Sequence, residues 1–451
     1  MALIGTATMV VALLPATGGS AGAERPEDPG AIPGSYIVVL AEGAEHPRTV
    51  AAEHSQAHDA VVTHVYGTAL RGYAARMSDQ AVARVAGDPR VAYVDVDRVV
   101  TTAHHQCGHT ARGKDGPCDD AEPDPPEARQ PVPWGVKRIG APVAGTTGAD
   151  VHVYVIDTGI DRGHGDLRVS DEGFAAESCR GRCAADWDDD HGHGTHVAGT
   201  IGALDNDLDV VGVAPDVTLH AVKVLAKNGS GTRSGVIAGI DWVVAHNPGQ
   251  ARVANMSLSG SGTMTGTCAS DSDPVEDGGP FEGTDAYHAA ICNATHAGVV
   301  FAVAAGNSGA NAAGAVPAAY ADTVVTVSAT TRDSDWPSWS NWGWGTGEAI
   351  GIPTNSVPVG IAAPGVEILS TRAGGGTTTM SGTSMAAPHV AGAVALYLGA
   401  NPEQAADATA FSHTRGHLLS AADPALGGED DTGGWQNTSN NPHHERFVQV
   451  P

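Results

Sequence analysis

Positive charge is scarce in this chain. Its 451 residues include 24 Lys and Arg against 51 Asp and Glu, which gives a formal net charge of −27 at pH 7. Proteins that bind nucleic acid or anionic lipid gather lysine and arginine on their surface. The balance of charge therefore argues against nucleic acid and membrane as partners. It fits a soluble extracellular protein that can recruit hard cations.

Long apolar runs are also scarce. The apolar run at the amino terminus lies within residues 1–23, is too short to span a bilayer, and ends in the small residues Ala21, Gly22 and Ala23. No Lys or Arg precedes it, which departs from the usual export signal. Its length and its small-residue end still predict a signal peptide over residues 1–23. We therefore expect a secreted, extracellular protein without a membrane helix.

Cysteine occurs in a small, even number. An even count in an exported chain favours disulfides, and six cysteines allow 15 pairings that the sequence cannot distinguish. Sequential pairing is our hypothesis, because the six lie in three close pairs. Zinc bound by the CRGRC pair is the alternative, although no second half of a zinc site follows it. The pairs are Cys107 with Cys118, Cys179 with Cys183, and Cys268 with Cys292.

Three segments each place one reactive residue at the end of a regular element. Asp157 closes the β-branched run VHVYVID, which predicts a carboxylate at the carboxyl end of a buried strand. His193 opens HGTHVAGTIGAL and Ser384 opens SMAAPHVAGAVALYL, and the helical spacing of both runs places these residues at helix amino ends. Open α/β sheets build their sites at such strand ends.

These residue types can form a catalytic set. A serine hydroxyl becomes a good nucleophile when an imidazole takes its proton, and the imidazole needs a carboxylate to fix its tautomer. A serine at a helix amino end also lies beside N–H donors that can hold an oxyanion. Asn307, in FAVAAGNSG, follows another buried-strand pattern and is the candidate for a further donor.

The blocks DTGID, HGTHVAGT, AAGN and GTSMAAPHVAG resemble the signature blocks of the subtilisin-like serine proteases. The likeness runs from about Trp134 to the carboxyl terminus. It implies a serine endopeptidase in which Asp157 orients, His193 acts as base and then as acid, and Ser384 attacks the peptide carbonyl. Asn307 and the backbone N–H of Ser384 would bind the oxyanion.

Each block alone has a more ordinary interpretation. An Asp at a strand end can be a turn residue, and a GTS before a helix can be a cap. The run HGHGTH could ligate zinc through His191, His193 and His196, but it lacks the glutamate of an HExxH motif. We therefore expect His196 to pack structurally.

Two other functions stay open. A serine esterase or lipase is disfavoured, because the residues around Ser384 do not form the GxSxG elbow and the order Asp, His, Ser differs. A catalytically inactive subtilase-like binding protein is disfavoured by the complete set of reactive residues. Casein hydrolysis, with Ser384→Ala as control, separates the three.

Residues 34–103 predict a small α+β domain. SYIVVL, GYAARM and VAYVDVDRVV are typical of strands, while residues 51–67 and SDQAVARVA are typical of helices. The pattern resembles the inhibitor-type propeptide of the same protease family, with an independent binding module as the alternative. The resemblance implies an intramolecular inhibitor that assists folding and is removed by self-cleavage, which we place within Val100 to His104.

The remaining chain predicts a linker and a large α/β domain. Residues 104–133 are rich in Pro, Gly and charge, which favours a linker or a surface arm. Residues 134–451 alternate apolar strands with helices, which predicts a mostly parallel central sheet flanked by helices on both faces. We expect a monomer that acts on polypeptides and needs no organic cofactor.

The resemblance also implies where an extended substrate binds. A peptide can add as a strand to exposed backbone edges, and glycines there permit close approach. The wall of the pocket beside the cleaved bond and Ser308 carry no charge, so we expect broad cleavage after neutral or apolar residues. The implied edges are Gly229, Ser230 and Gly231, and Ser257, Leu258, Ser259 and Gly260; the implied pocket wall is Ala304, Ala305 and Gly306.

A structural calcium ion is the cofactor that the resemblance implies. The loop ALDNDLDVVGVAP matches the family's calcium loop in length, and Asp166 in HGDL occupies the position of the carboxylate ligand. Calcium prefers six to eight oxygen ligands. A solvated acidic turn is the alternative. The implied ligands are Asp166, the carbonyl oxygens of Leu204, Leu208 and Val210, and the side chain of Asn206.

A cluster of four tryptophans lies between Trp336 and Trp344. An aromatic wall that contacts carbohydrate is one interpretation, and packing within a loop is the one we favour. The segment after the cluster, residues 345–358, resembles an inserted surface loop.

Overall fold

The structure is a computed structural model. Several predictions lie outside the residues that it describes: the signal peptide, the pair Cys107 and Cys118, most of the linker, and Trp344. Among the helices of the described ranges, none combines the length and the hydropathy that a membrane span requires. The described residues are 30–103, 130–143, 145–181, 183–246, 249–268, 281–343, 359–405, 409–422 and 445–450.

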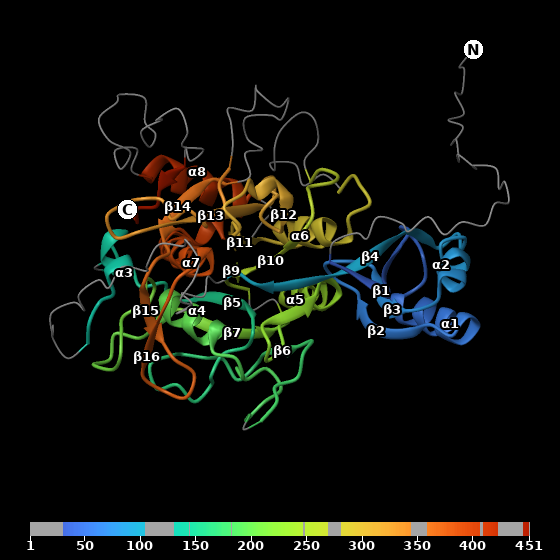
Figure 1. The fold of residues 1–451 in the computed structure, drawn as a ribbon, viewed down its shortest axis with the longest axis horizontal. Coiled ribbons are helices and arrows are strands. Elements are labelled where there is room, and N and C mark those ends of the chain that lie inside the picture. Colours follow the sequence, from blue (N-terminus) through green and yellow to red (C-terminus); the bar gives the residue numbers. More distant parts are fainter. Residues whose placement is uncertain are drawn as a thin grey trace, which may run out of the picture.

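The N-terminal domain, residues 30–103, is a four-stranded antiparallel sheet with two helices on one face (Figure 1). Side chains alternate along its strands, so Val38 and Leu40 of the first strand pack under the helices while Ile37 and Val39 face the other way. In spatial order the strands are β4 (Val91–Thr102), β1 (Ala31–Leu40), β3 (Gly72–Arg76) and β2 (Val61–Tyr66); the helices are α1 (Pro47–His58) and α2 (Asp79–Val85).

The helix predicted over residues 51–67 is wrong in its second half. Helix α1 ends at His58, where Asp59 adopts a left-handed conformation with a φ of 53°. The following residues, VVTHVY, are rich in β-branched side chains and pair with β3 as strand β2. The observed order is therefore β1-α1-β2-β3-α2-β4.

The main domain, from residue 130 onward, is built on a central sheet in which every adjacent pair of strands is parallel, which confirms the predicted fold class. Such sheets are buried on both faces, and most residues of the inner strands are accordingly buried. In spatial order the strands are β17 (Arg446–Phe447), β14 (Ile361–Pro364), β13 (Val324–Thr330), β11 (Val299–Ala304), β9 (Ala251–Met256), β5 (Val151–Asp157), β7 (Thr218–Lys223) and β6 (Phe174–Ala175).

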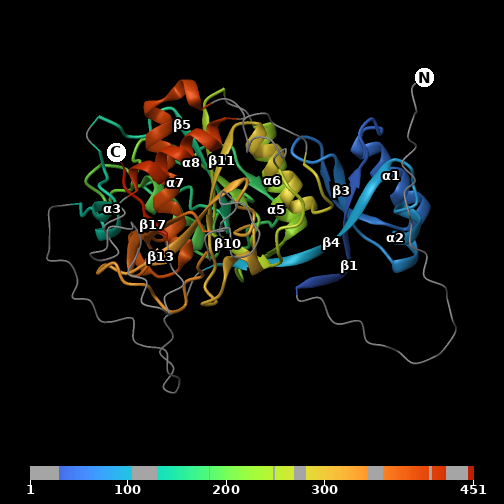
Figure 2. The ribbon, with the colours of Figure 1, turned by 90° about the horizontal axis from the view of Figure 1, so that it is seen from above.

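Helices cover both faces of this sheet. One face packs against α4, α7 and α8, and the other packs against α5 and α6, which lie toward the N-terminal domain (Figure 2). The helices are α3 (Trp134–Arg138), α4 (His193–Gly202), α5 (Arg233–Ala245), α6 (Ala286–His296), α7 (Thr383–Ala400) and α8 (Ala410–Ala421), with short 3-10 turns η1 (Ala312–Gly314) and η3 (Pro402–Gln404).

Strand β4 joins the two domains. Its first part belongs to the N-terminal sheet, while its last residues run between two short strands of the main domain, β8 and β10 (Figure 1). The short strands are β8 (Ser230–Thr232), β10 (Leu258–Ser261), β12 (Ala315–Val316), β15 (Ile368–Thr371) and β16 (Thr377–Met380).

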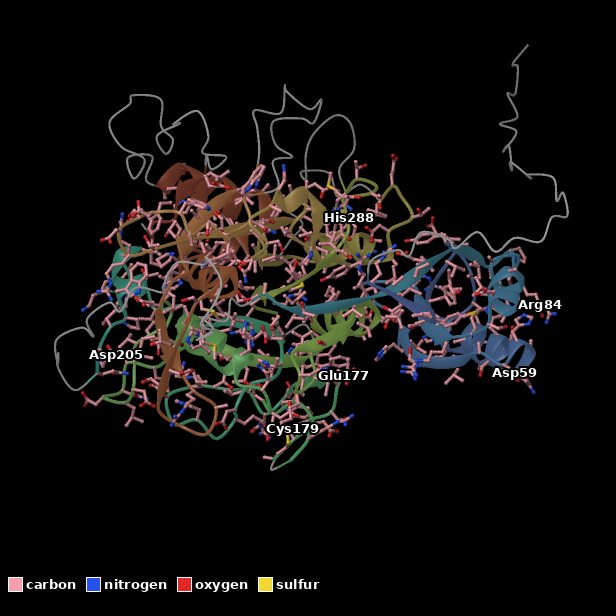
Figure 3. All side chains as sticks on the ribbon, in the orientation of Figure 1. Asp59, Arg84, Glu177, Cys179, Asp205 and His288 are labelled. Carbon is pink, nitrogen blue, oxygen red and sulfur yellow. A yellow bond between two sulfur atoms is a disulfide. The ribbon has the colours of Figure 1, made fainter. Side chains whose placement is uncertain are left out.

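Two of the three predicted disulfides are confirmed. Cys179 bonds to Cys183 in a loop of the main domain (Figure 3), and Cys268 bonds to Cys292 of α6. The disulfide at Cys179 overturns the alternative of zinc at that pair, because both sulfur atoms are used.

Candidate active site

The predicted carboxylate and imidazole are hydrogen-bonded to each other. Asp157 is the last residue of β5, which lies inside the central sheet, and its side chain is fully buried. His193 is the first residue of α4, and its Nδ1 lies 2.7 Å from Asp157 Oδ1. Because an ionised carboxylate can only accept, Nδ1 carries the proton and donates it. Nε2 of the neutral ring is then the proton acceptor, as a general base requires.

Asp189 holds the start of α4 in place. Its carboxylate accepts from the backbone N–H of Gly192 at 2.8 Å and of Thr195 at 2.9 Å. It also accepts from Thr158 Oγ1 at 2.9 Å, and that oxygen accepts from the backbone N–H of Gly194 at 2.9 Å. These bonds tie the end of β5 to the start of α4. Asp189 is not among the residues predicted from the sequence, although an aspartate just before a helix is a typical cap signal.

Ser384 lies in the first turn of α7. Gly382 precedes this helix with a φ of 153°, a conformation that glycine adopts and L side chains rarely do. The amino end of α7 carries N–H groups without a partner inside the helix, and one of them meets the end of the N-terminal domain. Ser384 Oγ donates to the backbone carbonyl of Ser257 at 3.0 Å. Its backbone N–H donates to the carbonyl oxygen of Ala103 at 3.1 Å.

The side-chain amide of Asn307 is oriented by α7. Its Oδ1 accepts from the backbone N–H of Thr383 at 2.9 Å and from Thr383 Oγ1 at 2.8 Å. Because two donors occupy the oxygen, the amide nitrogen faces the other way. It donates to the carbonyl oxygen of Ala103 at 2.5 Å. Thr383 is a further functional residue that was not predicted, although it belongs to the GTS block that contains Ser384.

The carbonyl oxygen of Ala103 thus receives two N–H donors, from Ser384 and Asn307. Two convergent donors of this kind can stabilise the oxyanion that forms when a nucleophile attacks a carbonyl. The backbone N–H of Ala103 donates to the carbonyl of Ser257 at 3.1 Å, which fixes the residue from its other side. Ala103 is the last described residue of the N-terminal domain.

The residues leading to Ala103 are held as a strand between the two predicted edges. On one side the backbone N–H of Thr102 donates to the carbonyl of Gly229 at 2.9 Å, and β4 pairs with β8. On the other side β4 pairs with β10, and a side chain on Gly260 would press on the carbonyl of Val99. The paired residues are Thr101 with Ser230 and Ser259, Val100 with Gly231, and Thr102 with Leu258.

The predicted pocket wall lies just before Asn307. Ala304 is the last residue of β11, and the three wall residues, Ala304, Ala305 and Gly306, are all buried. The carbonyl of Ala305 accepts from Asn341 Nδ2 and that of Gly306 accepts from the backbone N–H of Asn341, both at 2.9 Å. The bonds to Asn341 hold the segment that carries Asn307.

His196 packs structurally, as predicted. It is fully buried, its Nε2 lies 2.9 Å from the carbonyl oxygen of Ile368, and burial lowers its pKa to about 3. Among the described residues, ligand atoms gather as for a metal only at Cys268, Cys292 and His296, where the two cysteines form a disulfide. His191, His193 and His196 do not form such a group in the described structure.

Three of the five predicted calcium residues converge on the side chain of Gln130. Gln130 Nε2 donates to the carbonyl oxygens of Leu204 at 2.6 Å and Val210 at 2.8 Å, and lies 3.4 Å from Asn206 Oδ1. Three oxygen atoms therefore surround one point, which a cation could take in place of the amide nitrogen. Gln130 was not predicted, because it lies in a segment without a periodic pattern of apolar residues. Leu208 lies in the same loop, and its backbone N–H donates to Asn206 Oδ1 at 2.9 Å.

Asp166 borders this group of oxygens. Its Oδ2 accepts from the backbone N–H of Val210 at 3.1 Å, while its Oδ1 is buried without a hydrogen-bond partner. Burial, with Asp209 nearby, raises the pKa of this carboxyl to about 6. A buried carboxylate oxygen without a partner is costly unless a cation binds it. The donor set fits calcium on this ground.

The N-terminal domain also contacts the main domain away from the cleft. Asp97 is buried, and its carboxylate accepts from the backbone N–H of Ser234 at 3.0 Å and from Ser234 Oγ at 2.6 Å. Asp95 accepts from the backbone N–H of Ala286 at 3.2 Å. These two carboxylates thus cap the amino ends of α5 and α6, where negative charge is stabilising. In return, Asp241 of α5 accepts from three successive backbone N–H groups that begin at Gly67.

The tryptophan segment packs as a loop in its described part. The backbone N–H of Gly309 donates to the carbonyl of Trp339 at 2.8 Å, and that of Trp342 donates to Ala310 at 3.1 Å. Trp339 is partly buried and packs against the apolar core on the face of α4 and α7. These contacts favour the packing interpretation over an aromatic wall.

Comparisons with known proteins agree with this geometry. The model of the subtilase family matches residues 148–445, and the model of peptidase inhibitor I9 matches residues 35–103. The chain is 37% identical over 424 residues to the extracellular serine proteinase of Thermus sp. (strain Rt41A), covering 86% of this chain and 87% of the relative. It is 36% identical over 335 residues to subtilisin E of Bacillus subtilis (strain 168), covering 73% and 71%.

A solved structure shows the same fold. A cold adapted subtilisin-like serine proteinase aligns with a TM-score of 0.53 and 33% identity, covering 71% of this chain and 98% of that one. The N-terminal domain matched by the inhibitor model is an intramolecular inhibitor, and the main domain is the peptidase. The chain belongs to the subtilase family and is a subtilisin-like serine endopeptidase with an inhibitor propeptide.

Proposed function

We propose that Asp157, His193 and Ser384 are the catalytic triad and that Asn307 completes the oxyanion hole. The observation that carries the proposal is the carbonyl of Ala103, which accepts from Ser384 and Asn307 together. His193 Nε2 takes the proton of Ser384 Oγ as the oxygen attacks, and Asp157 stays ionised and stabilises the imidazolium. Before attack, the hydroxyl leaves the carbonyl of Ser257 and turns to the imidazole.

The same geometry supports autoprocessing. Ala103 presents its carbonyl to the nucleophile, so the bond cleaved during maturation is Ala103–His104. The products are a propeptide that ends at Ala103 and an enzyme that begins at His104. Afterwards the propeptide strand stays in the cleft as an inhibitor until it is degraded. A polypeptide substrate then takes the path of residues 99–102, with its main chain paired to β8 and β10.

Broad specificity for neutral or apolar residues is the second part of the proposal. The propeptide places the small apolar Ala103 before the cleaved bond, and this side chain packs in an apolar cluster. The implied wall of Ala304, Ala305 and Gly306 carries no charge that would select lysine or arginine. A peptide-library profile dominated by basic residues would contradict this.

Calcium binding at the loop of residues 204–210 is the third part. Asp166, Asn206 and the carbonyl oxygens of Leu204, Leu208 and Val210 would hold the ion in place of the Gln130 amide nitrogen, and the ion when bound would supply positive charge beside the buried carboxylate of Asp166. We expect a chelator to lower the melting temperature of the mature enzyme by several degrees and calcium to restore it. Asp166→Asn should reduce this response, while Asp186→Asn, in a different loop, should keep it. No response in the wild type would contradict the site.

Secretion is the fourth part. The short apolar run within residues 1–23, the two disulfides, and the extracellular proteinase among the relatives support it. Expression in a secreting host should yield product in the medium that lacks residues 1–23. Retention of these residues in a cell-bound product would count against export.

Labelling with a fluorophosphonate tests the catalytic assignment. The reagent should modify Ser384 in the wild type and leave Ser384→Ala unlabelled, and casein hydrolysis should disappear in the same variant. Hydrolysis of small esters without casein cleavage would favour an esterase. Substrate binding without either reaction would favour an inactive binding protein.

A further inference from the structure

A polar cavity of about 420 Å³ lies beside the propeptide strand, beyond the contacts that position Ala103. Arg98 and Asp95 line it from the propeptide, and Arg233, Asp285 and three threonines line it from the peptidase. Arg98 and Val100 are two residues apart on one strand, so their side chains point to the same side. Arg98 is the sixth residue before the proposed cleavage bond, and its side chain marks where a substrate side chain at that position would lie.

The peptidase side of the cavity holds the guanidinium of Arg233, whose hydrogen-bonding capacity is only partly satisfied. Arg233, at the start of α5, is 5% exposed, and one guanidinium nitrogen, Nη2, donates to the carbonyl of Ser261 at 2.6 Å. Its Nε is buried without a hydrogen-bond partner. A buried donor of a charged group without a partner is costly, and a ligand that accepts from it gains that energy on binding.

The neighbouring carboxylate of the peptidase does not neutralise this cation by direct pairing. Asp285 Oδ1 accepts from the backbone N–H groups of Tyr287 at 3.0 Å and His288 at 3.1 Å. Its Oδ2 accepts from Tyr320 Oη at 2.8 Å and lies 3.3 Å from Thr265 Oγ1. Both carboxylate oxygens of Asp285 thus accept hydrogen bonds from groups other than Arg233, and its charge lies at the amino end of α6.

The propeptide itself brings a carboxylate to this cavity. Asp95 lies close enough to Arg233 for the guanidinium to favour its ionised form, although burial on balance raises its pKa. When the propeptide leaves, Asp95 and Arg98 leave with it. Of the described residues that line the cavity, Arg233 is then the one cation, with Thr263, Thr265 and Thr284 as polar neighbours.

We propose that Arg233 and these threonines form a subsite for an acidic side chain at the sixth residue before the cleaved bond. This inference rests on the proposed function, because it counts positions from Ala103. It makes Arg233 a determinant of specificity in a chain whose charge is otherwise strongly negative. Polypeptides with Glu or Asp upstream of an apolar cleavage site are the substrates favoured.

Quenched fluorescent peptides test the subsite on the mature enzyme. Three peptides share the sequence Val-Val-Thr-Thr-Ala-His-His and carry Glu, Gln or Arg before it, and mass spectrometry verifies cleavage after Ala. We expect kcat/KM for the Glu peptide to exceed that for Gln by about 5- to 10-fold at low salt, and the Arg peptide to be the poorest. In 1 M NaCl the preference should shrink, because salt screens the interaction.

Variants assign the preference to Arg233. Arg233→Gln should bring the Glu to Gln ratio to about one, and Arg233→Lys should keep part of it. The matched control is Arg168→Gln, which removes a surface arginine paired with Asp216; it should keep the wild-type ratio. Equal cleavage of the Glu and Gln peptides by the wild type, or a preference that survives Arg233→Gln, overturns the subsite. Failure to cleave any peptide or casein would instead overturn the proposed function.

Discussion

The two faces of the central sheet are completed in different ways. On the face of α4 and α7, the apolar core is formed by the main domain, apart from Ala103 at its edge. On the face of α5 and α6, the core continues into the propeptide, which adds several fully buried side chains, each worth roughly 1.5–3 kcal/mol for a large apolar residue. The propeptide residues in that core are Ile37, Val39, Tyr66, Ala69, Leu70, Ala74 and Val100.

The proposed catalytic residues and the main contacts with the propeptide therefore lie on different faces of the sheet. The proposed catalytic residues stand at the start of α4 and α7 and at the end of β5, so they belong to the face that the peptidase completes alone. The amino ends of α5 and α6 are capped by Asp97 and Asp95 of the propeptide. A propeptide that supplies both apolar surface and helix caps to one face can guide its formation and still leave without disturbing the catalytic residues.

The largest expected effect is on catalysis and concerns the face of α4 and α7, which the peptidase completes alone. Ser384→Ala should lower kcat by about 10⁶-fold, the value for subtilisin, which is the reference enzyme of this family. The unprocessed chain should also accumulate with the propeptide attached, because the same serine is proposed to cleave it. Activity is measured on a peptide substrate, and processing by intact mass. A processed product from purified Ser384→Ala would contradict the assignment.

The next effect comes from the oxyanion donor. Asn307→Ala should lower kcat by about 10²- to 10³-fold with little change in KM, again the reference range of this family for one such donor. Circular dichroism should show an unchanged fold, because Asn307 acts on the reacting carbonyl. A large rise in KM with an unchanged kcat would place Asn307 outside the oxyanion hole.

Acid should lower the unfolding free energy of the mature enzyme through a histidine on the face of α5. His220 on β7 stacks on Tyr154 and lies 2.7 Å from His152, and burial lowers its pKa to about 3. In the unfolded chain the imidazole of His220 binds a proton near pH 6.5, whereas in the folded enzyme it stays neutral until the pH approaches 3. The contribution of the neutral, buried His220 to stability is therefore complete above pH 6.5 and is lost as the pH falls toward 3. Between pH 7 and pH 4 this residue alone should cost about 3 kcal/mol in unfolding free energy.

Denaturant unfolding at several pH values measures this slope. His220→Gln should reduce the loss of stability on acidification. The exposed His413 is the control, and His413→Gln should keep the wild-type slope. Identical slopes for wild type and His220→Gln would show that His220 does not sense the acid.

The smallest of these effects concerns the face of α5 and α6, to which the propeptide contributes. Asp97→Asn in the Ser384→Ala chain should lower the unfolding free energy of the zymogen by about 2 kcal/mol, because the cap of α5 loses its charge. Glu42→Gln, at an exposed position of the same domain, should change it little. Equal stability of both variants would show that the capping contact does not hold the two domains together.

Much of this arrangement followed from local pattern. The apolar run before Asp157 and the small-residue helices after His193 and Ser384 fixed the ends of three elements, and parallel pairing brings such ends to one edge of the sheet. The error over residues 51–67 arose because an apolar run with polar neighbours fits a helix or a strand, and the left-handed turn at Asp59 has no strong sequence signal.

Other features depend on contacts between distant segments. Asp97 and Ser234 are 137 positions apart, and Gln130 reaches Val210 across 80 positions. No periodicity links such pairs, since each lies in a segment whose own pattern is ordinary. The self-cleavage site was predicted as a range from Val100 to His104, and the proposal of the Ala103–His104 bond rests on the two N–H donors that meet the carbonyl of Ala103.

The amino terminus of the processed enzyme tests the central claim most directly. The claim is that the carbonyl of Ala103 lies between the donors of Ser384 and Asn307 because the following bond is the one that the enzyme cuts in itself. Amino-terminal sequencing and intact mass of the first processed product, captured early after refolding, should give a chain that begins at His104. A first product that begins elsewhere, for example beyond Cys118, with no trace of a His104 terminus, would contradict the account.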